Sequence, residues 1–142
     1  LVENCEVRNS RARALLFQTE NVTVRNCRFF GISLPGILMS PDIVVWYEMS
    51  PVKNVLIENC VFEKCGFVGK NDSNAAISVK TSHDGPDNTA QGIHSNITIK
   101  NNVFKDVRNK AIYMTSVEGF DIENNDFGKE DFSETAVLQN CK

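Results

Sequence analysis

A short phrase built around asparagine recurs along the chain and constrains its fold more than any other feature. In each copy a charged residue precedes the asparagine, and Val or Phe follows the asparagine by three positions. The five asparagines are Asn4, Asn26, Asn59, Asn101 and Asn124. They are separated by 22, 33, 42 and 23 residues, so two spacings are near 22 and two are longer. Repetition at this length indicates stacked structural units with insertions.

A second apolar phrase follows each copy of the first. Its five members begin at Ala14, Gly36, Ala76, Ala111 and Ala136. The gap from the preceding Val or Phe is 7 residues in three units, 14 in the third and 9 in the last. We therefore read each unit as a strand, an asparagine, a short strand, a turn, a third strand and a connection of variable length.

The alternation of inward-facing residues explains why an asparagine lies between the two strands of each unit. Val55 and Ile57 are two positions apart, as the inward face of a strand requires, and Cys60 and Phe62 are also two apart. Ile57 and Cys60 are three apart, so the chain must turn a corner there and keep the same face inward. Asn tolerates positive φ better than other residues apart from Gly, which suits it to such a corner.

These patterns predict an all-β, right-handed, single-stranded parallel β-helix of about five turns, forming one domain over residues 1–142. Stacking would build an inner column of phenylalanines and an adjacent column of Cys and Asn. The expected members are Phe29, Phe62, Phe104, Phe127, and Cys5, Cys27, Cys60, Asn102, Asn125. No segment sustains helical spacing of apolar residues, and a sandwich would not explain the repeated seven-residue gap. Because the chain starts in mid-strand, we expect it to be part of a longer protein.

Composition limits the remaining possibilities. A net charge of −3 leaves no electrostatic footprint for nucleic acid, and no apolar run is long enough to span a membrane. Of the five cysteines, three occupy the repeat column, where we expect buried free thiols rather than disulfides. No Cys/His spacing suits zinc, and Asp84 with Asp87 offers too few oxygens for calcium, so neither a metal nor a cofactor is predicted. The open first and last turns allow end-to-end or edge self-association.

Two long connections interrupt the repeat at the same corner of consecutive units. They run over residues 41–53 and 82–95, and we expect them to meet, because insertions in repeat proteins collect on one side. The first brings Asp42, Trp46, Tyr47 and Glu48, and the second brings His83, Asp84, Asp87 and His94. Aromatic rings stack on sugar C–H faces and carboxylates accept bonds from hydroxyls, so this set favours a glycan ligand. The alternatives are that Trp46 packs inward as a lid and that both histidines are ordinary loop residues.

A pair of arginines, Arg11 and Arg13, precedes the third strand of the first unit. Guanidinium groups in a corner suit bidentate recognition of hydroxyls or carboxylates. The alternative is an ion pair with Glu48 or Glu20.

Three stretches of this sequence resemble the β-helix of glycoside hydrolase family 110, the bacterial α-1,3-galactosidases. They are "RARALLFQT", "PGILM" and "WYEMSPVKNVLIENCVFEKCG", so the resemblance covers roughly residues 1–66, and the rest is similar to β-helices in general. Within the third stretch, Ser50 stands where the family has Gly. The matching residues are Trp46, Tyr47, Glu48, Pro51, Val52, Lys53 and Asn54.

The resemblance implies a C-terminal part of a β-helical glycosidase that acts on terminal α-linked galactose. The family's Asp-containing catalytic strand has no counterpart in this sequence, so the resemblance implies a cleft wall rather than the catalytic carboxylates. The residues expected to contact an oligosaccharide or polysaccharide are Arg11, Arg13, Asp42, Trp46, Tyr47 and Glu48. The isolated segment would then be inactive, and the parent protein periplasmic or extracellular. The alternative function is a non-catalytic glycan-binding or structural β-helix module.

Overall fold

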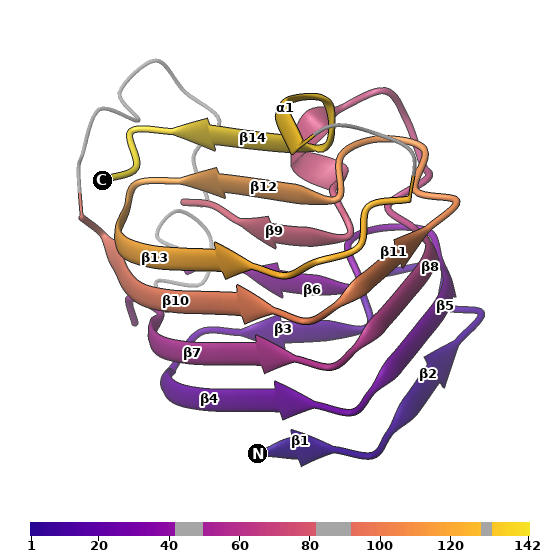
Figure 1. The fold of residues 1–142 in the computed structure, drawn as a ribbon, viewed down its shortest axis with the longest axis horizontal. Helices are drawn as coiled ribbons and strands as arrows, with labels where there is room; N and C mark the ends of the chain where they lie inside the picture. Colours follow the sequence, from indigo (N-terminus) through magenta and orange to yellow (C-terminus); the bar gives the residue numbers. More distant parts are fainter. Residues whose placement is uncertain (42–49, 82–91, 129–131) are drawn as a thin grey trace.

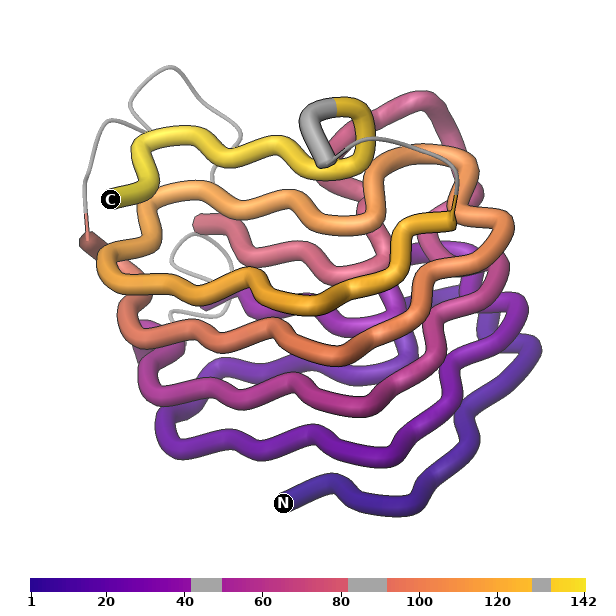
Figure 2. Tube along the Cα trace, in the orientation of Figure 1, coloured from indigo at the N-terminus to yellow at the C-terminus, as the bar shows by residue number. Residues whose placement is uncertain are grey.

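The computed structural model describes residues 1–41, 50–81, 92–128 and 132–142 of the chain. The chain winds as a right-handed parallel β-helix, in which successive turns lie above one another and contribute strands to three sheets (Figures 1 and 2). Every strand pairing in the described ranges is parallel. The fold class predicted from the repeat is therefore confirmed.

The three sheets contain five, four and five strands. The first sheet is formed by β1 (Val2–Glu3), β4 (Glu20–Arg25), β7 (Lys53–Glu58), β10 (His94–Lys100) and β13 (Val117–Glu123). The second is formed by β2 (Glu6–Arg8), β5 (Arg28–Ile32), β8 (Val61–Cys65) and β11 (Val103–Lys105). The third is formed by β3 (Leu15–Phe17), β6 (Ile37–Met39), β9 (Ile77–Val79), β12 (Ile112–Thr115) and β14 (Ala136–Gln139).

Three corners connect the sheets in every turn. We call the passage from the first to the second sheet the first corner, from the second to the third sheet the second corner, and from the third sheet to the next turn the third corner. Two short helices, η1 (Asp72–Asn74) and α1 (Phe132–Thr135), belong to the second corner. They occupy the units in which the gap before the third strand is longer than seven residues, so the extra length forms local helical structure.

The first corner is made by the repeated asparagine. All five of these residues have positive φ, at 55° for Asn4, 53° for Asn26, 54° for Asn59, 55° for Asn101 and 51° for Asn124. The backbone N–H of Asn59 donates to the carbonyl of Lys100 in the next turn, and the same bond recurs at Asn4, Asn26 and Asn101. Because the left-handed conformation absorbs the extra residue, the ladder continues around the corner without loss of the inward face.

Replacing Asn59 tests this backbone requirement. Asn59→Ala should lower the free energy of unfolding by about 1 kcal/mol, because a Cβ-bearing aliphatic residue is strained at positive φ, whereas Asn59→Gly should lose less. Urea denaturation of the three proteins measures the difference. Equal losses for the alanine and glycine variants would contradict this explanation.

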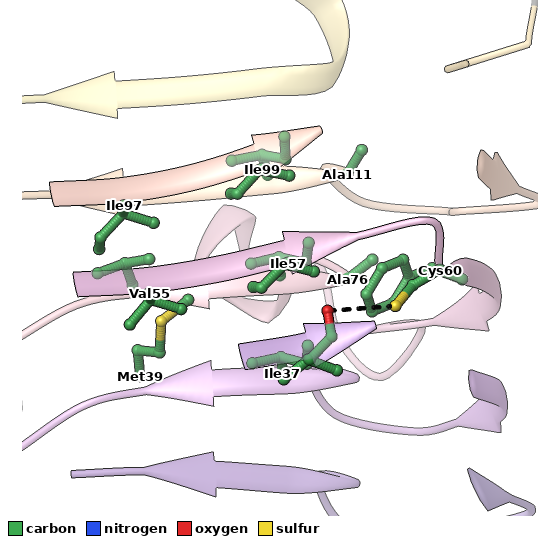
Figure 3. Packing of buried hydrophobic residues seen from close by; sticks show 14 of the residues in the cluster. Ile37, Met39, Val55, Ile57, Cys60, Ala76, Ile97, Ile99 and Ala111 are labelled. Carbon is green, nitrogen blue, oxygen red and sulfur yellow. Dashed lines mark hydrogen bonds between the residues drawn. The ribbon is translucent and has the colours of Figure 1, made fainter. Parts of the chain in front are cut away.

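A stack of phenylalanines runs through the core beside the second sheet. Ring centroids are 4.9 Å apart for Phe29 and Phe62, 5.2 Å for Phe62 and Phe104, and 5.2 Å for Phe104 and Phe127. Aliphatic side chains stack in the same way on the first sheet, with Val55 below Ile97 and Ile57 below Ile99 (Figure 3). The predicted aromatic column is confirmed, and it follows from parallel in-register pairing, which places equivalent residues directly over each other.

Phe62 lies in the middle of this stack and is fully buried, so its truncation tests the core. Phe62→Ala should lower the free energy of unfolding by about 3–5 kcal/mol, because the cavity removes contacts to both neighbouring rings. Leu16, which is 38% exposed, is the matched control, and Leu16→Ala should cost less than about 1 kcal/mol. Comparable losses of unfolding free energy for the two variants in chemical denaturation would show that the phenylalanine stack contributes no more to stability than an exposed side chain.

The adjacent inner column changes from cysteine to asparagine along the solenoid. The backbone N–H of Cys60 donates to Asn102 Oδ1 at 2.9 Å, and the backbone N–H of Asn102 donates to Asn125 Oδ1 at 2.9 Å. The amide nitrogens of Asn102 and Asn125 donate to the carbonyls of Ile57 and Ile99. The two asparagines thus hydrogen-bond the buried backbone from inside the core.

All five cysteines are free thiols, and Cys27 and Cys60 are buried as expected. The prediction of burial is wrong for Cys5, which is exposed because it lies in the first described turn and only the turn above covers it. Burial raises the pKa of Cys60 and of Cys65 to about 12, so neither is a thiolate at neutral pH. Cys65, for which the sequence pattern gave no prediction, packs in the core and pairs with Ile32 of the preceding turn.

A ladder of exposed asparagines lies beside the third corner, near the N-terminal ends of β4, β7 and β10. Asn54 Nδ2 donates to Asn21 Oδ1 at 3.0 Å, and Asn96 Nδ2 donates to Asn54 Oδ1 at 3.1 Å. All three have positive φ, and the next turn places Gly119 there with φ of 70°. A Cβ on Gly119 would lie 3.0 Å from Asn96 Oδ1, so the ladder ends at a residue without a side chain.

The lower end of the solenoid is less well covered than its middle. Val7, Leu15 and Phe17 of the first turn are half-buried, whereas the residues paired above them are buried. Self-association through such an end stays a prediction. Among the helices in the described ranges, none has the length and apolar character needed to cross a membrane.

Candidate functional site

The third corner is where the two long connections leave and re-enter the solenoid. β6 and β9 end side by side, with Met39 paired to Val79, and β7 and β10 begin side by side, with Lys53 paired to Ser95. Residues 42–49 and 82–91 lie outside the described ranges. They include the predicted contact residues Asp42, Trp46, Tyr47 and Glu48, together with His83, Asp84 and Asp87. Their roles, and their meeting over one cleft, stay predictions, although both stretches join neighbouring strand ends.

His94 is not the loop residue that the sequence suggested. It is the first residue of β10, its side chain is fully buried, and its Nδ1 accepts the backbone N–H of Val52 at 3.2 Å. Burial lowers the pKa of His94 to about 4, with the carbonyl of Lys80 acting weakly in the opposite direction. The neutral, inward-facing imidazole therefore joins consecutive turns through this hydrogen bond.

The buried imidazole predicts a pH dependence of stability. Because the folded pKa of about 4 lies below the unfolded value of 6.5, the stability contribution of neutral His94 is complete above pH 6.5 and is lost as the pH falls toward 4. The whole shift corresponds to roughly 3 kcal/mol. His94→Gln keeps an acceptor for Val52 and should flatten the slope of unfolding free energy between pH 6.5 and 5. Parallel slopes for the two proteins would contradict the assignment.

Arg11 and Arg13 lie at the second corner of the first turn, and both side chains are exposed. The turn that holds them is fastened by Ala12 N–H, which donates to Ser10 Oγ, and by Ala14 N–H, which donates to the carbonyl of Pro35. Glu20, one of the two suggested ion-pair partners, instead contacts Lys53 at 3.7 Å. The other, Glu48, is outside the described residues.

In the chain, the arginines precede the N-terminal end of a third-sheet strand, whereas the stretch 42–49 follows the C-terminal end of the neighbouring strand. Arg13 precedes β3, whereas residue 42 follows the C-terminal end of β6, the strand paired with β3. The described part of the chain does not bring the two halves of the predicted site together. The arginines lie at the second corner, where later turns form a surface that the sequence did not predict.

An enlarged second corner in the third turn shapes that surface. Gly66 has φ of 68°, and a Cβ at this position would lie 1.8 Å from the carbonyl oxygen of Asn74. The chain can therefore fold back on itself only with glycine there. The stretch is also held by Asn71, whose Oδ1 accepts Ser73 N–H, and by Asn74, whose Nδ2 donates to the carbonyl of Val68. The 14-residue gap in the third unit was the signal that could have found it.

Beside this corner lies a hollow of about 550 Å³, which we call the second-corner groove. Four successive turns contribute to it. Its lining residues are Asn9, Phe30, Gly31, Lys64, Phe67, Asp106 and Arg108. Phe30 points outward because its neighbour Phe29 points into the core. The groove thus combines two aromatic rings with cationic, anionic and amide groups, a composition that suits a polar ligand with an apolar face.

A second hollow of about 390 Å³ shares Arg108 with the groove. It is lined by Lys70, Asp72, Arg108, Asn109, Lys110 and Glu134. A third hollow, of about 440 Å³, lies where Phe104, Phe127 and Ala111 meet Thr135. Since these three apolar residues belong to the core or pack against it, this hollow marks the upper end of the core. In the described ranges, no group of three His, Cys, Asp or Glu side chains is arranged to hold a metal ion.

The architecture defines the class of protein to which the chain belongs. Residues 1–141 match the family described as the right-handed β-helix region, and the chain is a member of that family.

Within this class the chain is distantly homologous to bacterial α-1,3-galactosidases. It is 30% identical over 125 residues to α-1,3-galactosidase A of Bacteroides fragilis, covering 87% of this chain and 20% of the relative. It is 34% identical over 122 residues to α-1,3-galactosidase B of Parabacteroides distasonis, covering 84% of this chain and 20% of the relative. A shorter match to α-1,3-galactosidase A of Peterkaempfera griseoplana has 42% identity over 53 residues, covering 37% of this chain and 7% of the relative.

These matches extend the similarity well past residue 66, where the recognisable motifs end, so the later turns are also related to these enzymes. The chain spans about one fifth of the length of the relatives it matches over most of its length.

Proposed function

We propose that this chain forms part of a β-helical glycoside hydrolase that acts on terminal α-linked galactose, and that it supplies a wall of the glycan cleft. The observation that carries the proposal is the similarity to α-1,3-galactosidases over most of the chain. In this proposal Arg11, Arg13, Asp42, Trp46, Tyr47 and Glu48 contact the sugar.

The described carboxylates support a wall rather than a catalytic pair. Hydrolysis with inversion needs two carboxyl groups about 6.5–9.5 Å apart with water between them, one of which is a general acid. Several carboxylates on the solenoid are instead engaged by cations. The pairs are Glu3–Arg25, Glu20–Lys53, Glu58–Lys100 and Glu63–Arg28. We therefore assign the acid and the base to other parts of the parent protein.

The second candidate function is a non-catalytic glycan-binding β-helix. It is favoured by the second-corner groove, whose rings and polar groups could hold a sugar without any reaction.

Turnover by the parent protein tests the first proposal. The product of the whole gene should hydrolyse nitrophenyl α-galactoside, and Arg13→Ala or Glu48→Ala should lower kcat/KM by about tenfold or more, as expected for the loss of a charged hydrogen bond to substrate. Arg8→Ala is the matched control, because Arg8 is an exposed arginine of the same turn that faces Glu6, and it should leave kcat/KM unchanged.

The outcomes separate the candidates. Unchanged turnover in both Arg13→Ala and Glu48→Ala, with folding intact by circular dichroism, would remove the assignment of these residues. A parent protein that binds galactosides and never cleaves them would favour the non-catalytic module.

A further inference from the structure

The cations of the first sheet are neutralised within the solenoid. Each lies against a carboxylate of the preceding turn, at 2.7 Å for Glu3 and Arg25, 3.7 Å for Glu20 and Lys53, and 3.6 Å for Glu58 and Lys100. Parallel in-register stacking places such side chains one strand spacing apart, which allows opposite charges to pair along the axis.

The cations of the second corner are not neutralised in this way. Among the residues that the structure describes, none of five basic side chains at or beside this corner lies in an ion pair. They are Arg11, Arg13, Lys64, Lys70 and Arg108. The chain has 18 acidic residues and only 15 basic ones, so a shortage of carboxylates does not explain the difference. Basic groups of this corner therefore lie outside ion pairs, and Asp72, Asp106 and Glu134 line the same hollows.

Two of these cations, Lys64 and Arg108, line the second-corner groove with Phe30 and Phe67. The ammonium of Lys64 lies 5.9 Å from the ring centroid of Phe30, and the guanidinium of Arg28 lies 5.8 Å from the same centroid. These contacts hold positive charge over an aromatic wall. The second ring, Phe67, is half-buried and has no such cation contact among the described residues, which leaves it suited to stack on a sugar.

A glycine without a side chain lies on the lining of the groove next to Asn9. Gly31 has φ of 65°, and a Cβ there would lie 3.1 Å from Asn9 Oδ1. The absence of a side chain leaves the amide of Asn9 at the floor, where it can bond a hydroxyl. Asp106, also on the lining, is suited to accept bonds from hydroxyl groups.

We propose that the second-corner groove binds an anionic polysaccharide, with a carboxylate or sulfate held by Lys64 and Arg108 and a sugar face against Phe67. The second hollow shares Arg108 with the groove and is lined by Lys70 and Lys110 as well as by Asp72 and Glu134, so in this proposal it takes a further sugar of the same chain. Nucleic acid is the less suitable polyanion, because its phosphates are dense and the protein carries a net charge of −3. This inference goes beyond the proposed hydrolase and stands without it, because binding is measured separately from galactoside cleavage.

Affinity electrophoresis and calorimetry of this chain test the proposal with four probes: polygalacturonate, chondroitin sulfate, a neutral galactan, and single-stranded DNA. We expect binding to at least one anionic glycan that weakens with added salt, and much weaker binding to the neutral one. Comparison of the carboxylated and sulfated glycans identifies the anionic group.

Matched variants locate the binding site. Lys64→Ala with Arg108→Ala should weaken anionic glycan binding by about tenfold, as two charge contacts of up to about 1 kcal/mol each allow. Lys53→Ala with Lys100→Ala removes the same charge from the first sheet and should change affinity less than about twofold. Phe67→Ala should weaken binding through loss of stacking. If the alanine double variant melts lower than the parent chain, Lys64→Gln with Arg108→Gln replaces it.

Three results would overturn the proposal: equal losses for the two double variants, tighter binding of DNA than of either anionic glycan, or no preference for anionic over neutral glycan. Hydrolysis of α-galactosides by the parent protein bears on the preceding proposal and leaves this one unaffected.

Discussion

In-register stacking of parallel turns is the constraint on which the whole molecule depends. Each inner strand pairs with its equivalents in the turns above and below, so side chains at equivalent positions stack directly on one another. The phenylalanine stack, the inner cysteine–asparagine column and the outer asparagine ladder are three consequences of this one pairing. A local change is therefore felt mainly by the two neighbouring turns, as expected for a protein built from nearest-neighbour contacts.

The corners allow this stacking to coexist with variation in length. At the first corner the left-handed asparagine repeats in all five units, and the chain there never lengthens. At the second and third corners the chain lengthens in individual units, and the strands on either side stay in register. Because an insertion at a corner disturbs no ladder hydrogen bond, the solenoid tolerates new surface there. The second-corner groove is one such surface, built around the extra residues of the third turn.

Charge is distributed over the solenoid in two different ways. On the first sheet opposite charges alternate along the axis and pair between turns, which suits a surface that only needs to be soluble. At the second corner basic groups face a hollow with aromatic walls and lie outside such pairs. Among the described residues Lys64 and Arg108 lie in no ion pair, so their position beside a groove is consistent with the proposed recognition of an anionic ligand.

The sequence by itself determined the architecture, because the signals were local and repeated. The positive-φ asparagine, the parity step from Ile57 to Cys60 and the stacked phenylalanines could all be read from spacing, since an in-register repeat makes equivalent positions neighbours. His94 was misjudged because its burial depends on Val52, which lies 42 positions earlier and outside any repeated phrase. Only the tertiary structure decided the second-corner groove: Asn9, Phe30, Phe67 and Arg108 belong to four turns and share no motif. They meet because the strands stay in register across insertions of unequal length, and Phe67 and Arg108 lie in corner segments outside the repeated phrases.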